Sequence, residues 1–419
     1  MRRLVMDRLE RPGEFDPIAR RIAVRVARKL SGPTDAELSE RVIDAAARLE
    51  AAIPTSRRID RYIREARPDV VLVSPVVRVG SSQVEFLKSA RKLGIPAATC
   101  VASWDNLTSK GLLKFVPQRV FVWNEVQRRE AIELHAMPAS RVVTTGAQLF
   151  DQWFERRPSS TRGEFMRKIG LDATQPYVLF LGSSRFVAGK LTHEIRFVTR
   201  WIETLRTSDD ERLRRLGIAI RPHPTGRRWH EVDLGRFENV VVWPRRSARP
   251  VTADEQAGFF DSLTHSAAVV GINTTAMIEA AIVGKSVLTI LDQEFAQEST
   301  LHFHYLLQEN GGFLRVASSL AEHARQLSRV LEPGDGQAEG QARFIESFVR
   351  PYGLDRPATP ILADEVERLA GAPVDAAEHA RWSRLMLILD VPLSSIALVA
   401  FSARRWLRGL RRRAPTRAS

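Results

Sequence analysis

The sequence predicts an α/β protein built from two doubly wound, Rossmann-like domains. Three observations predict this fold. The apolar segments are short and continuous rather than alternating, which is typical of strands covered on both faces of a parallel sheet. Helical patterns separate these segments, so strands and helices alternate along the chain. The strands fall into two series, and a chain of 419 residues is long enough for two cores.

A polar stretch separates the two series of predicted strands. The first series comprises residues 69–75, 96–103, 119–124 and 141–146. The second comprises residues 177–184, 217–224, 240–244, 267–273, 286–291 and 313–318. Residues 155–165, ERRPSSTRGEF, break both periodicities and are the predicted linker. We therefore expect an N-terminal domain over residues 1–160, a C-terminal domain over 161–365 and a basic tail over 366–419.

The composition predicts a globular cytoplasmic protein. Hydrophobic residues make up 44% of the chain and charged residues 27%, which is not the composition of a disordered protein. The single cysteine, Cys100, has no partner in the chain for a disulfide, which indicates a reducing compartment. The N-terminal residues contain basic side chains but no continuous apolar run, so no secretory signal is predicted.

The net charge of +14 is concentrated in the tail. Nine arginines and one acid, Asp390, lie between Arg381 and Arg417, which contributes 9 − 1 = +8. The rest of the chain holds 54 basic and 48 acidic side chains, or +6. That is an ordinary balance for a soluble enzyme and does not indicate a nucleic-acid partner.

The tail admits two interpretations. Residues 381–413 have an apolar middle with arginine and tryptophan at both ends, and Asp390 and Pro392 interrupt it. Neither apolar half approaches the roughly 18 residues of a spanning helix. We favour an amphipathic segment that binds anionic lipid, which would make the protein peripheral on the inner face of the cell membrane. The alternative is a packed helix followed by a solvated basic end.

Polar residues follow three strands of the second series, where parallel strands share one edge of a sheet. A helix is predicted from about residue 275, with Asn273 or Thr274 as its N-cap. Helix N-termini at this edge favour phosphate groups, so the sequence predicts an anion site. For this segment alone, the alternative is an ordinary capped helix with Glu279 facing solvent. The predicted contributors are Gly182, Ser183 and Ser184, then Arg221 and His223, then Asn273, Thr274, Thr275 and Glu279.

Two segments of the second series resemble a known family. RPHPTG (221–226) and GINTTAMIEAAIVGKSVLTI (271–290) look like the nucleotide-binding half of GT-B glycosyltransferases. The relatives include UDP-N-acetylglucosamine 2-epimerases, CDP-glycerol glycerophosphotransferases and bacterial surface-polysaccharide transferases. The resemblance covers about residues 170–350, and RFIESFVRPYG (343–353) is similar to the final GT-B helix that crosses back to the first domain.

The resemblance implies a nucleotide-sugar substrate, UDP-linked, with no resident cofactor. It makes the C-terminal domain the nucleotide-sugar side and the N-terminal domain the acceptor side. It places the diphosphate near Ser183, Asn273, Thr274 and Thr275, with His223 close by and Glu279 toward the ribose.

The first series carries one polar cluster, VASWDNLTSKG (101–111), directly after a strand. Asp105 is the predicted base that deprotonates an acceptor hydroxyl. Trp104 is predicted to stack on a sugar, and Asn106 and Lys110 to contact sugar or acceptor. The alternative is an Asx-type turn, in which Asp105 and Asn106 bond their own backbone and Trp104 is packed.

Two histidines lie two residues apart in STLHFHYL (299–306). On a strand, His302 and His304 would share a face. No cysteine or further histidine at ligand spacing supports a metal, so none is predicted. A donor-sugar contact and a plain surface loop both remain open.

One feature departs from the GT-B pattern. Residues 1–65 read as basic helical segments, and the first predicted strand begins at Asp69. The N-terminal domain is therefore abbreviated, or its first strand–helix unit has diverged.

The predicted function is transfer of a sugar from a nucleotide-sugar to a cell-surface glycan or lipid-linked acceptor, with Asp105 and His223 as the catalytic residues. Three alternatives stand: a UDP-N-acetylglucosamine 2-epimerase, a CDP-glycerol glycerophosphotransferase, and a non-catalytic nucleotide-binding relative.

Overall fold

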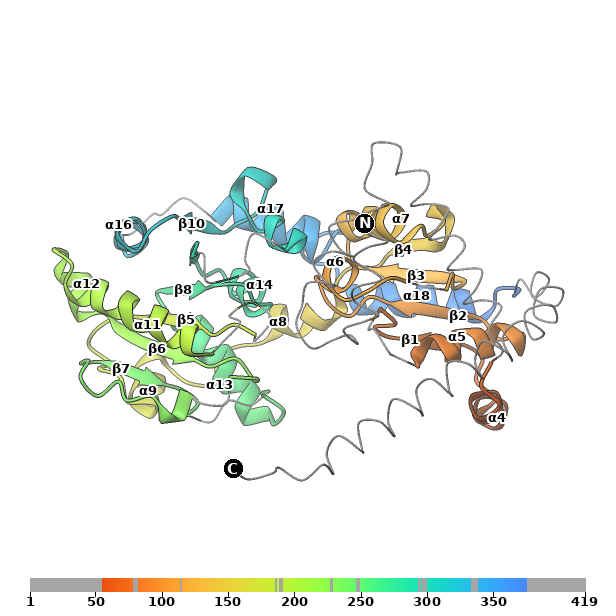
Figure 1. Ribbon diagram of the computed structural model, residues 1–419, viewed down its shortest axis with the longest axis horizontal. Helices are drawn as coiled ribbons and strands as arrows, with labels where there is room; N and C mark the ends of the chain where they lie inside the picture. The colour runs from red at the N-terminus through yellow and green to blue at the C-terminus, as the bar shows by residue number, and fades with distance from the viewer. Residues whose placement is uncertain are drawn as a thin grey trace, which may run out of the picture.

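The computed structural model describes residues 55–77, 82–113, 115–184, 187, 191–226, 229–245, 249–292, 295, 300–332 and 338–374. These residues form two lobes, each built around one parallel sheet (Figure 1). All ten predicted strands are present, each shorter than predicted. The tail prediction for residues 381–413 lies outside the described residues.

The first sheet has four strands in sequential order. Neighbouring strands pair in parallel, with Val71 opposite Ala97 and Ala98 opposite Arg119. The strands are β1 (Val71–Val73), β2 (Ala97–Cys100), β3 (Arg119–Val122) and β4 (Val142–Thr144). Because the order never reverses among the described strands, their crossover connections run along one face of this sheet.

Helices from opposite ends of the chain cover the two faces of the first sheet. On one face, α5 (Gln83–Lys92) and α7 (Glu125–His135) pack on β1 to β4, and α4 (Arg57–Ala66) packs on α5. On the other face, α18 (Ala358–Ala370) buries Leu369 against Ala98 and Phe121. The C-terminal part of the described chain therefore completes the N-terminal lobe (Figure 1).

The second sheet has six parallel strands in the order β10-β9-β8-β5-β6-β7. The chain starts at the centre, moves outward to β7, and then crosses back to β8 on the other side of β5. This is the doubly wound order, with its reversal between β5 and β8. The strands are β5 (Tyr177–Leu181), β6 (Gly217–Arg221), β7 (Val240–Val242), β8 (Ala268–Gly271), β9 (Val287–Ile290) and β10 (Arg315–Ala317).

Strand β5 explains why the apolar runs do not alternate. Tyr177 and Leu179 point into one core and Val178 and Phe180 into the other, and all four side chains are fully buried. One core is closed by α9 (Arg162–Ile169), α13 (Ala253–Thr264), α14 (Ala276–Ile282) and α17 (Ala338–Phe348). The other is closed by α11 (Leu191–Arg206), α12 (Glu211–Arg215) and α16 (Leu320–Val330).

The remaining elements are short. Three lie at or near the junction of the lobes: α6 (Asn106–Ser109), α8 (Asp151–Glu155) and α15 (Leu301–His304). The 3-10 turns are η1 (Ala139–Arg141), η2 (Gln148–Phe150), η3 (Trp229–Glu231) and η4 (Gln308–Asn310).

Local signals in the sequence account for where several helices begin. Thr161 and Thr252 each cap a helix, α9 and α13, with a glutamate three residues later that bonds back to the cap. Asn124 accepts the Gln127 amide at the start of α7. These caps fix the ends of helices that pack on the sheets.

Between residues 55 and 374 the chain crosses between the lobes twice, and Asp151 connects the second crossing to the first. Its carboxylate accepts the backbone N–H groups of Ala358 and Thr359, at 3.0 and 2.7 Å, and pairs with Arg350 at 3.1 Å. These bonds cap the start of α18. Residues 343–348 lie in α17 on the second lobe, so the helix that covers the first lobe is the next one, α18.

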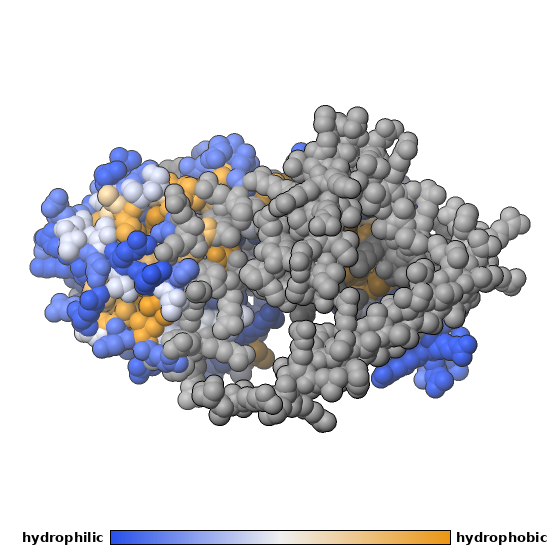
Figure 2. Space-filling model, viewed as in Figure 1, coloured by the Kyte–Doolittle hydropathy of each residue, from blue (hydrophilic) through white to orange (hydrophobic). Residues whose placement is uncertain are grey.

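No helix among the described residues combines the length and apolarity needed to cross a bilayer. On the face shown in Figure 2, apolar residues gather over the inner part of the second-sheet lobe and hydrophilic residues surround them.

Candidate functional site

The ends of β5 and β6 pack against each other at the carboxyl edge of the second sheet. Gly182 donates its N–H to the Arg221 carbonyl at 2.9 Å. A Cβ on Gly182 would lie 2.7 Å from the backbone nitrogen of His223, so only glycine fits here. Because β8 is the other neighbour of β5, the three predicted strand ends meet at one edge, at the reversal of strand order.

Arg221 is the buried cation of this edge. Its side chain is 9% exposed and its guanidinium lies 4.2 Å above the Phe259 ring. Burial lowers the pKa of Arg221 to about 10, against the opposing effects of Glu279 and Glu255, so the group is charged at neutral pH. Its buried Nη1 has no hydrogen-bond partner in the described part of the chain. A buried cation with unused donors is suited to bind an anion.

Glu279 lies one turn into α14 and faces the same cluster. Burial raises its pKa to about 7, although Arg221 and Arg156 act in the opposite direction. The carboxyl is therefore near its titration midpoint at neutral pH. The surroundings of Glu279 therefore differ from the predicted alternative, in which its carboxylate faces solvent.

His223 is held as a neutral hydrogen-bond donor. Its Nδ1 accepts the Thr225 backbone N–H at 3.2 Å, which leaves the ring proton on Nε2. Burial, together with Arg249, lowers the pKa of His223 to about 4, so the imidazole is uncharged at neutral pH. In this state His223 offers one N–H at the edge of the sheet.

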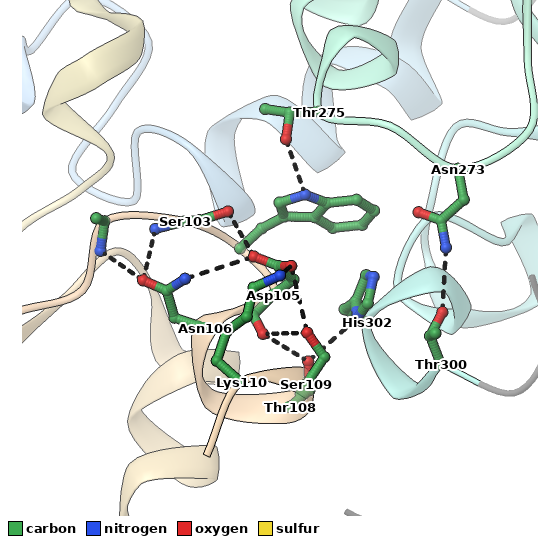
Figure 3. Close-up of polar contacts among 12 residues, drawn as sticks. Ser103, Asp105, Asn106, Thr108, Ser109, Lys110, Asn273, Thr275, Thr300 and His302 are labelled. Atoms are coloured by element: carbon green, nitrogen blue, oxygen red, sulfur yellow. Dashed lines mark hydrogen bonds and ion pairs between the residues drawn. The ribbon is translucent and has the colours of Figure 1, made fainter. Parts of the chain in front are cut away.

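The helix after β8 begins later than predicted. The N-cap of α14 is Thr275 rather than Asn273 or Thr274, and the Thr275 side chain makes no capping hydrogen bond. The Asn273 amide instead donates to Thr300 Oγ1 at 3.1 Å, so Asn273 orders the approach to α15 (Figure 3). Thr274 contributes its carbonyl, which accepts the Met277 N–H.

The turn after β5 does not present all its amides to a ligand. The Gly182 N–H is bonded to Arg221, and the Ser183 N–H donates to Glu194 Oε1 at 2.5 Å. Ser184, at the end of the turn, accepts the Val187 N–H. In this structure, protein acceptors therefore occupy the N–H groups of Gly182 and Ser183, two of the predicted contributors to the anion site.

The first lobe contributes the turn at residues 101–111. Asn106 Oδ1 accepts the N–H groups of Ala102 and Ser103, at 3.0 and 3.1 Å. Asp105 accepts the Ser103 hydroxyl at 2.7 Å and pairs with Lys110 Nζ at 2.7 Å. As in the alternative that the sequence left open, Asn106 bonds its own backbone and Trp104 is packed. Asp105 differs from that alternative, because its carboxylate bonds side chains instead of its own backbone.

The electrostatics of this turn keep Asp105 ionised. Burial by itself would raise the pKa of Asp105, but Lys110, His302 and the Ser103 hydroxyl outweigh it and hold the pKa below its ordinary value. The Asp105 carboxylate is therefore ionised at neutral pH, and it is a weak base while Lys110 is paired with it.

This turn docks directly on the second lobe (Figure 3). The Trp104 indole N–H donates to Thr275 Oγ1 at 3.1 Å, and the ring packs edge-on against His302 at 4.6 Å. Thr108 Oγ1 lies 3.1 Å from His302 Nδ1. Trp104 is only 3% exposed, so protein groups occupy the surface that was predicted to stack on a sugar.

The paired histidines lie on a helix, not on a strand. His302 and His304 belong to α15, where residues two apart point in opposite directions because successive residues turn by about 100°. His302 faces the first lobe and is 6% exposed. The condition for a shared face, a strand at this position, is therefore not fulfilled. Among the described residues, no group of three or more histidine, cysteine, aspartate or glutamate side chains is placed to hold a metal.

Comparison with solved structures finds similar folds at low sequence identity. UDP-GlcNAc 2-epimerase from Neisseria meningitidis, bound to UDP-GlcNAc, matches with a TM-score of 0.48 and 14% identity over 74% of this chain and 79% of that one. Anabaena Alr3699/HepE in complex with UDP-glucose matches with a TM-score of 0.46 and 12% identity, over 75% and 82%. A glycosyltransferase from Rickettsia africae matches with a TM-score of 0.47 and 9% identity, over 81% and 83%.

These similarities concern the fold alone. The two parallel sheets confirm the predicted architecture of two Rossmann-like domains. No protein-family model matches the chain, and no curated protein is significantly similar to it.

Sequence reasoning missed two buried carboxyl groups near the site. Glu194 of α11 is fully buried, and Glu130 of α7 is 4% exposed. Burial raises the pKa of Glu130 to about 8, against the opposing effects of Tyr305 and Arg129. Glu194 lies three and four residues before Phe197 and Val198, on the apolar face of its helix. A charged residue on an apolar helix face is the sequence signal that indicates a buried carboxyl group.

Proposed function

We propose that the protein binds a nucleotide-sugar with its diphosphate at the carboxyl edge of the second sheet. The observation that carries this proposal is Arg221, a buried cation with an unpartnered Nη1 at the end of β6, one strand from the reversal of strand order between β5 and β8. Burying such a group costs free energy unless a partner compensates for it. An anionic ligand supplies that partner. In open α/β sheets, ligands bind at this position.

Two further groups suit a diphosphate linked to a ribose. His223 presents a neutral Nε2–H, which donates to a phosphate oxygen without adding charge. Glu279, on the first turn of α14, accepts ribose hydroxyls. In this scheme, Arg221 and His223 stabilise the negative charge that develops on the leaving diphosphate.

We propose that the sugar is transferred to a cell-surface glycan or lipid-linked acceptor. The Asp105 carboxylate, on the first lobe and close to His302, is the proposed base for the acceptor hydroxyl. An interfacial tail would hold the cleft near a lipid-linked acceptor on the inner face of the membrane. Polysaccharide synthesis for the cell envelope is the process that this chemistry would serve.

A 2-epimerase is the second candidate, and one observation favours it. Ionisable groups come from both lobes at the junction: Asp105 and Glu130 from the first, His302 and Glu279 from the second. Epimerisation at C2 needs acid and base groups on both faces of the sugar and no second substrate.

Incubation of the full chain with UDP-GlcNAc alone, followed by proton NMR, separates the candidates. Appearance of the 2-epimer identifies the epimerase. Consumption of the donor only when a membrane extract supplies acceptor, with labelled sugar recovered in that extract, supports the transferase. CDP-glycerol takes the place of UDP-GlcNAc in a parallel arm, which tests the phosphotransferase. Binding of every donor without turnover in any arm would contradict an enzymatic function.

A further inference from the structure

Glu194 is a buried carboxylate that bonds to two loops of the candidate site at once. It lies in the first turns of α11 and is 0% exposed. Its Oε1 accepts the Ser183 backbone N–H at 2.5 Å, and its Oε2 accepts the Trp229 indole N–H at 3.2 Å. One side chain thus connects the segment after β5 with the segment after β6.

The two bonded segments are those that carry the nucleotide-site candidates. Ser183 follows Gly182, whose close contact with the His223 nitrogen leaves no room for a Cβ. Trp229, 1% exposed, lies six residues after His223. A Cβ on Gly226 would meet the Trp229 ring at 3.4 Å, so Gly226 packs against the indole. Movement of Trp229 would therefore be transmitted to His223.

Stability alone does not account for a glutamate at this position. The neighbouring side chains of α11 that face the sheet, Phe197 and Val198, are apolar and equally buried. Burial raises the pKa of Glu194 to about 7, against the opposing effects of the hydrogen bonds from Ser183 and Trp229. Burying a carboxylate here costs desolvation free energy. In return, the carboxylate supplies two fixed hydrogen-bond acceptors, which an apolar side chain cannot supply.

We propose that Glu194 is a positioning residue of the nucleotide site, which sets the turn at Gly182–Ser184 relative to Trp229 and to the residues His223–Gly226 that pack against it. This inference rests on the proposed function, because His223, in one of the two segments that Glu194 orders, is assigned to the diphosphate. Glu194 does not contact the nucleotide itself. Its side chain faces the interior, and both oxygens are used by protein donors.

Glutamine at position 194 tests this role because it keeps the shape and removes one acceptor. Its carbonyl still accepts the Ser183 N–H, but its amide nitrogen is a donor and opposes the Trp229 N–H. Glu194→Gln should weaken the binding of UDP by roughly tenfold, the effect of losing a hydrogen bond to a charged group. Trp229→Phe removes the opposed donor. Adding it to Glu194→Gln should cost little more, so the two effects should be strongly non-additive.

The experiment is titration calorimetry of UDP against the full chain and its variants. Glu203→Gln, an exposed glutamate on the same helix paired with Arg236, is the matched control and should bind UDP like the wild type. Nitrogen–proton NMR of the indole groups gives a second readout. The resonance that disappears in Trp229→Phe should move in Glu194→Gln and stay unchanged in Glu203→Gln.

Each outcome decides between the two proposals. Weaker binding by Glu194→Gln, non-additive with Trp229→Phe, supports the positioning role. Equal UDP affinity for wild type and Glu194→Gln, with a shifted Trp229 resonance, overturns it and leaves the nucleotide site standing. Absence of binding by every nucleotide overturns both proposals.

Discussion

The Trp104 indole N–H donates to Thr275 Oγ1 at 3.1 Å, and these two residues are 171 positions apart in the sequence. Trp104 belongs to the turn after β2 of the first lobe, and Thr275 is the N-cap of α14 in the second. The indole also belongs to the core that contains Met277 and Ile278 of α14. The first lobe therefore rests on the start of the helix that borders the proposed diphosphate site.

A double-mutant cycle measures this contact. Trp104→Phe keeps an aromatic ring and removes the donor, and Thr275→Val removes the acceptor at similar volume. Each should lower the free energy of unfolding by about 1 kcal/mol, and the double variant should lose less than the sum, because both remove one hydrogen bond. Urea unfolding followed by circular dichroism gives the values.

The control for this cycle is Trp123→Phe, whose indole N–H donates to the Val101 carbonyl within the first lobe. Paired with Thr275→Val, it should show additive losses. Additive losses for Trp104→Phe and Thr275→Val as well would contradict a direct contact between the lobes.

Glu130 should make stability fall as pH rises. Its folded-state pKa is raised from 4.5 to about 8, mainly by burial, so between these values the folded chain binds more protons than the unfolded chain. The free energy of unfolding therefore decreases over this window. Glu130→Gln should match the wild type near pH 4 and be more stable by about 4 to 5 kcal/mol at pH 8.5. Melting temperatures across pH test this.

Glu133→Gln is the control for this pH series, because Glu133 is an exposed carboxylate on the same helix, α7. Its melting curve should follow the wild type at every pH. A Glu130→Gln variant that also follows the wild type at pH 8.5 would refute the buried, protonated state of Glu130.

Lys110 should tune Asp105 if Asp105 is the catalytic base. Their ion pair, 2.7 Å between Nζ and Oδ2, helps to hold the pKa of Asp105 low. Lys110→Met removes that charge, so the acidic limb of the pH–rate profile should move to higher pH. Asp105→Asn should lower turnover by roughly 10²-fold or more and leave UDP affinity within about threefold.

Lys92→Met provides the matched control, since Lys92 pairs with Asp60 elsewhere in the first lobe. It should leave the pH–rate profile in place. If Asp105→Asn retains wild-type turnover, the carboxylate serves only the turn, and the base lies elsewhere.

The tail prediction concerns residues 381–419, outside the described part of the chain. The full protein should sediment with vesicles that contain phosphatidylglycerol and stay in solution with vesicles of phosphatidylcholine alone, because the arginines seek anionic headgroups. Deleting residues 381–419 should abolish sedimentation. Replacing Arg411, Arg412 and Arg413 by glutamine should weaken it in a salt-dependent way. Sedimentation of the truncated chain would assign membrane binding to another part of the molecule.

The fold was largely predictable because its strands are buried on both faces. Continuous apolar runs such as 177–181 identify central parallel strands, and capping patterns such as Thr161 with Glu164 identify where helices begin. The features of the fold that the sequence did not predict depend on contacts between residues far apart in the chain. Nothing near Ala358 indicates that α18 returns to the first sheet, since the acceptor for its first amides, Asp151, is 207 residues away.

The site was predicted at the level of strand ends and less well at the level of atoms. Residues at the carboxyl edge could be named because parallel strands share an edge, and Arg221, His223 and Glu279 do gather there. The use of each backbone amide was not predictable. The Ser183 N–H donates to Glu194, and the Trp104 ring packs against His302. No local sequence pattern indicates either contact. The short helix that carries His302 and His304 was not predicted, because a four-residue helix leaves too little periodicity to distinguish it from a loop or a strand.

Titration calorimetry of UDP, GDP, CDP and dTDP against wild type, Arg221→Met and Arg215→Met tests the nucleotide site most directly. Arg215 is an exposed arginine on α12 and serves as the matched control. One nucleotide should bind the wild type and Arg215→Met with a single site, and Arg221→Met should lose at least roughly tenfold in affinity, because the buried charge-assisted contact is gone. Binding that survives unchanged in Arg221→Met, or no binding of any nucleotide to the wild type, would contradict the proposed site.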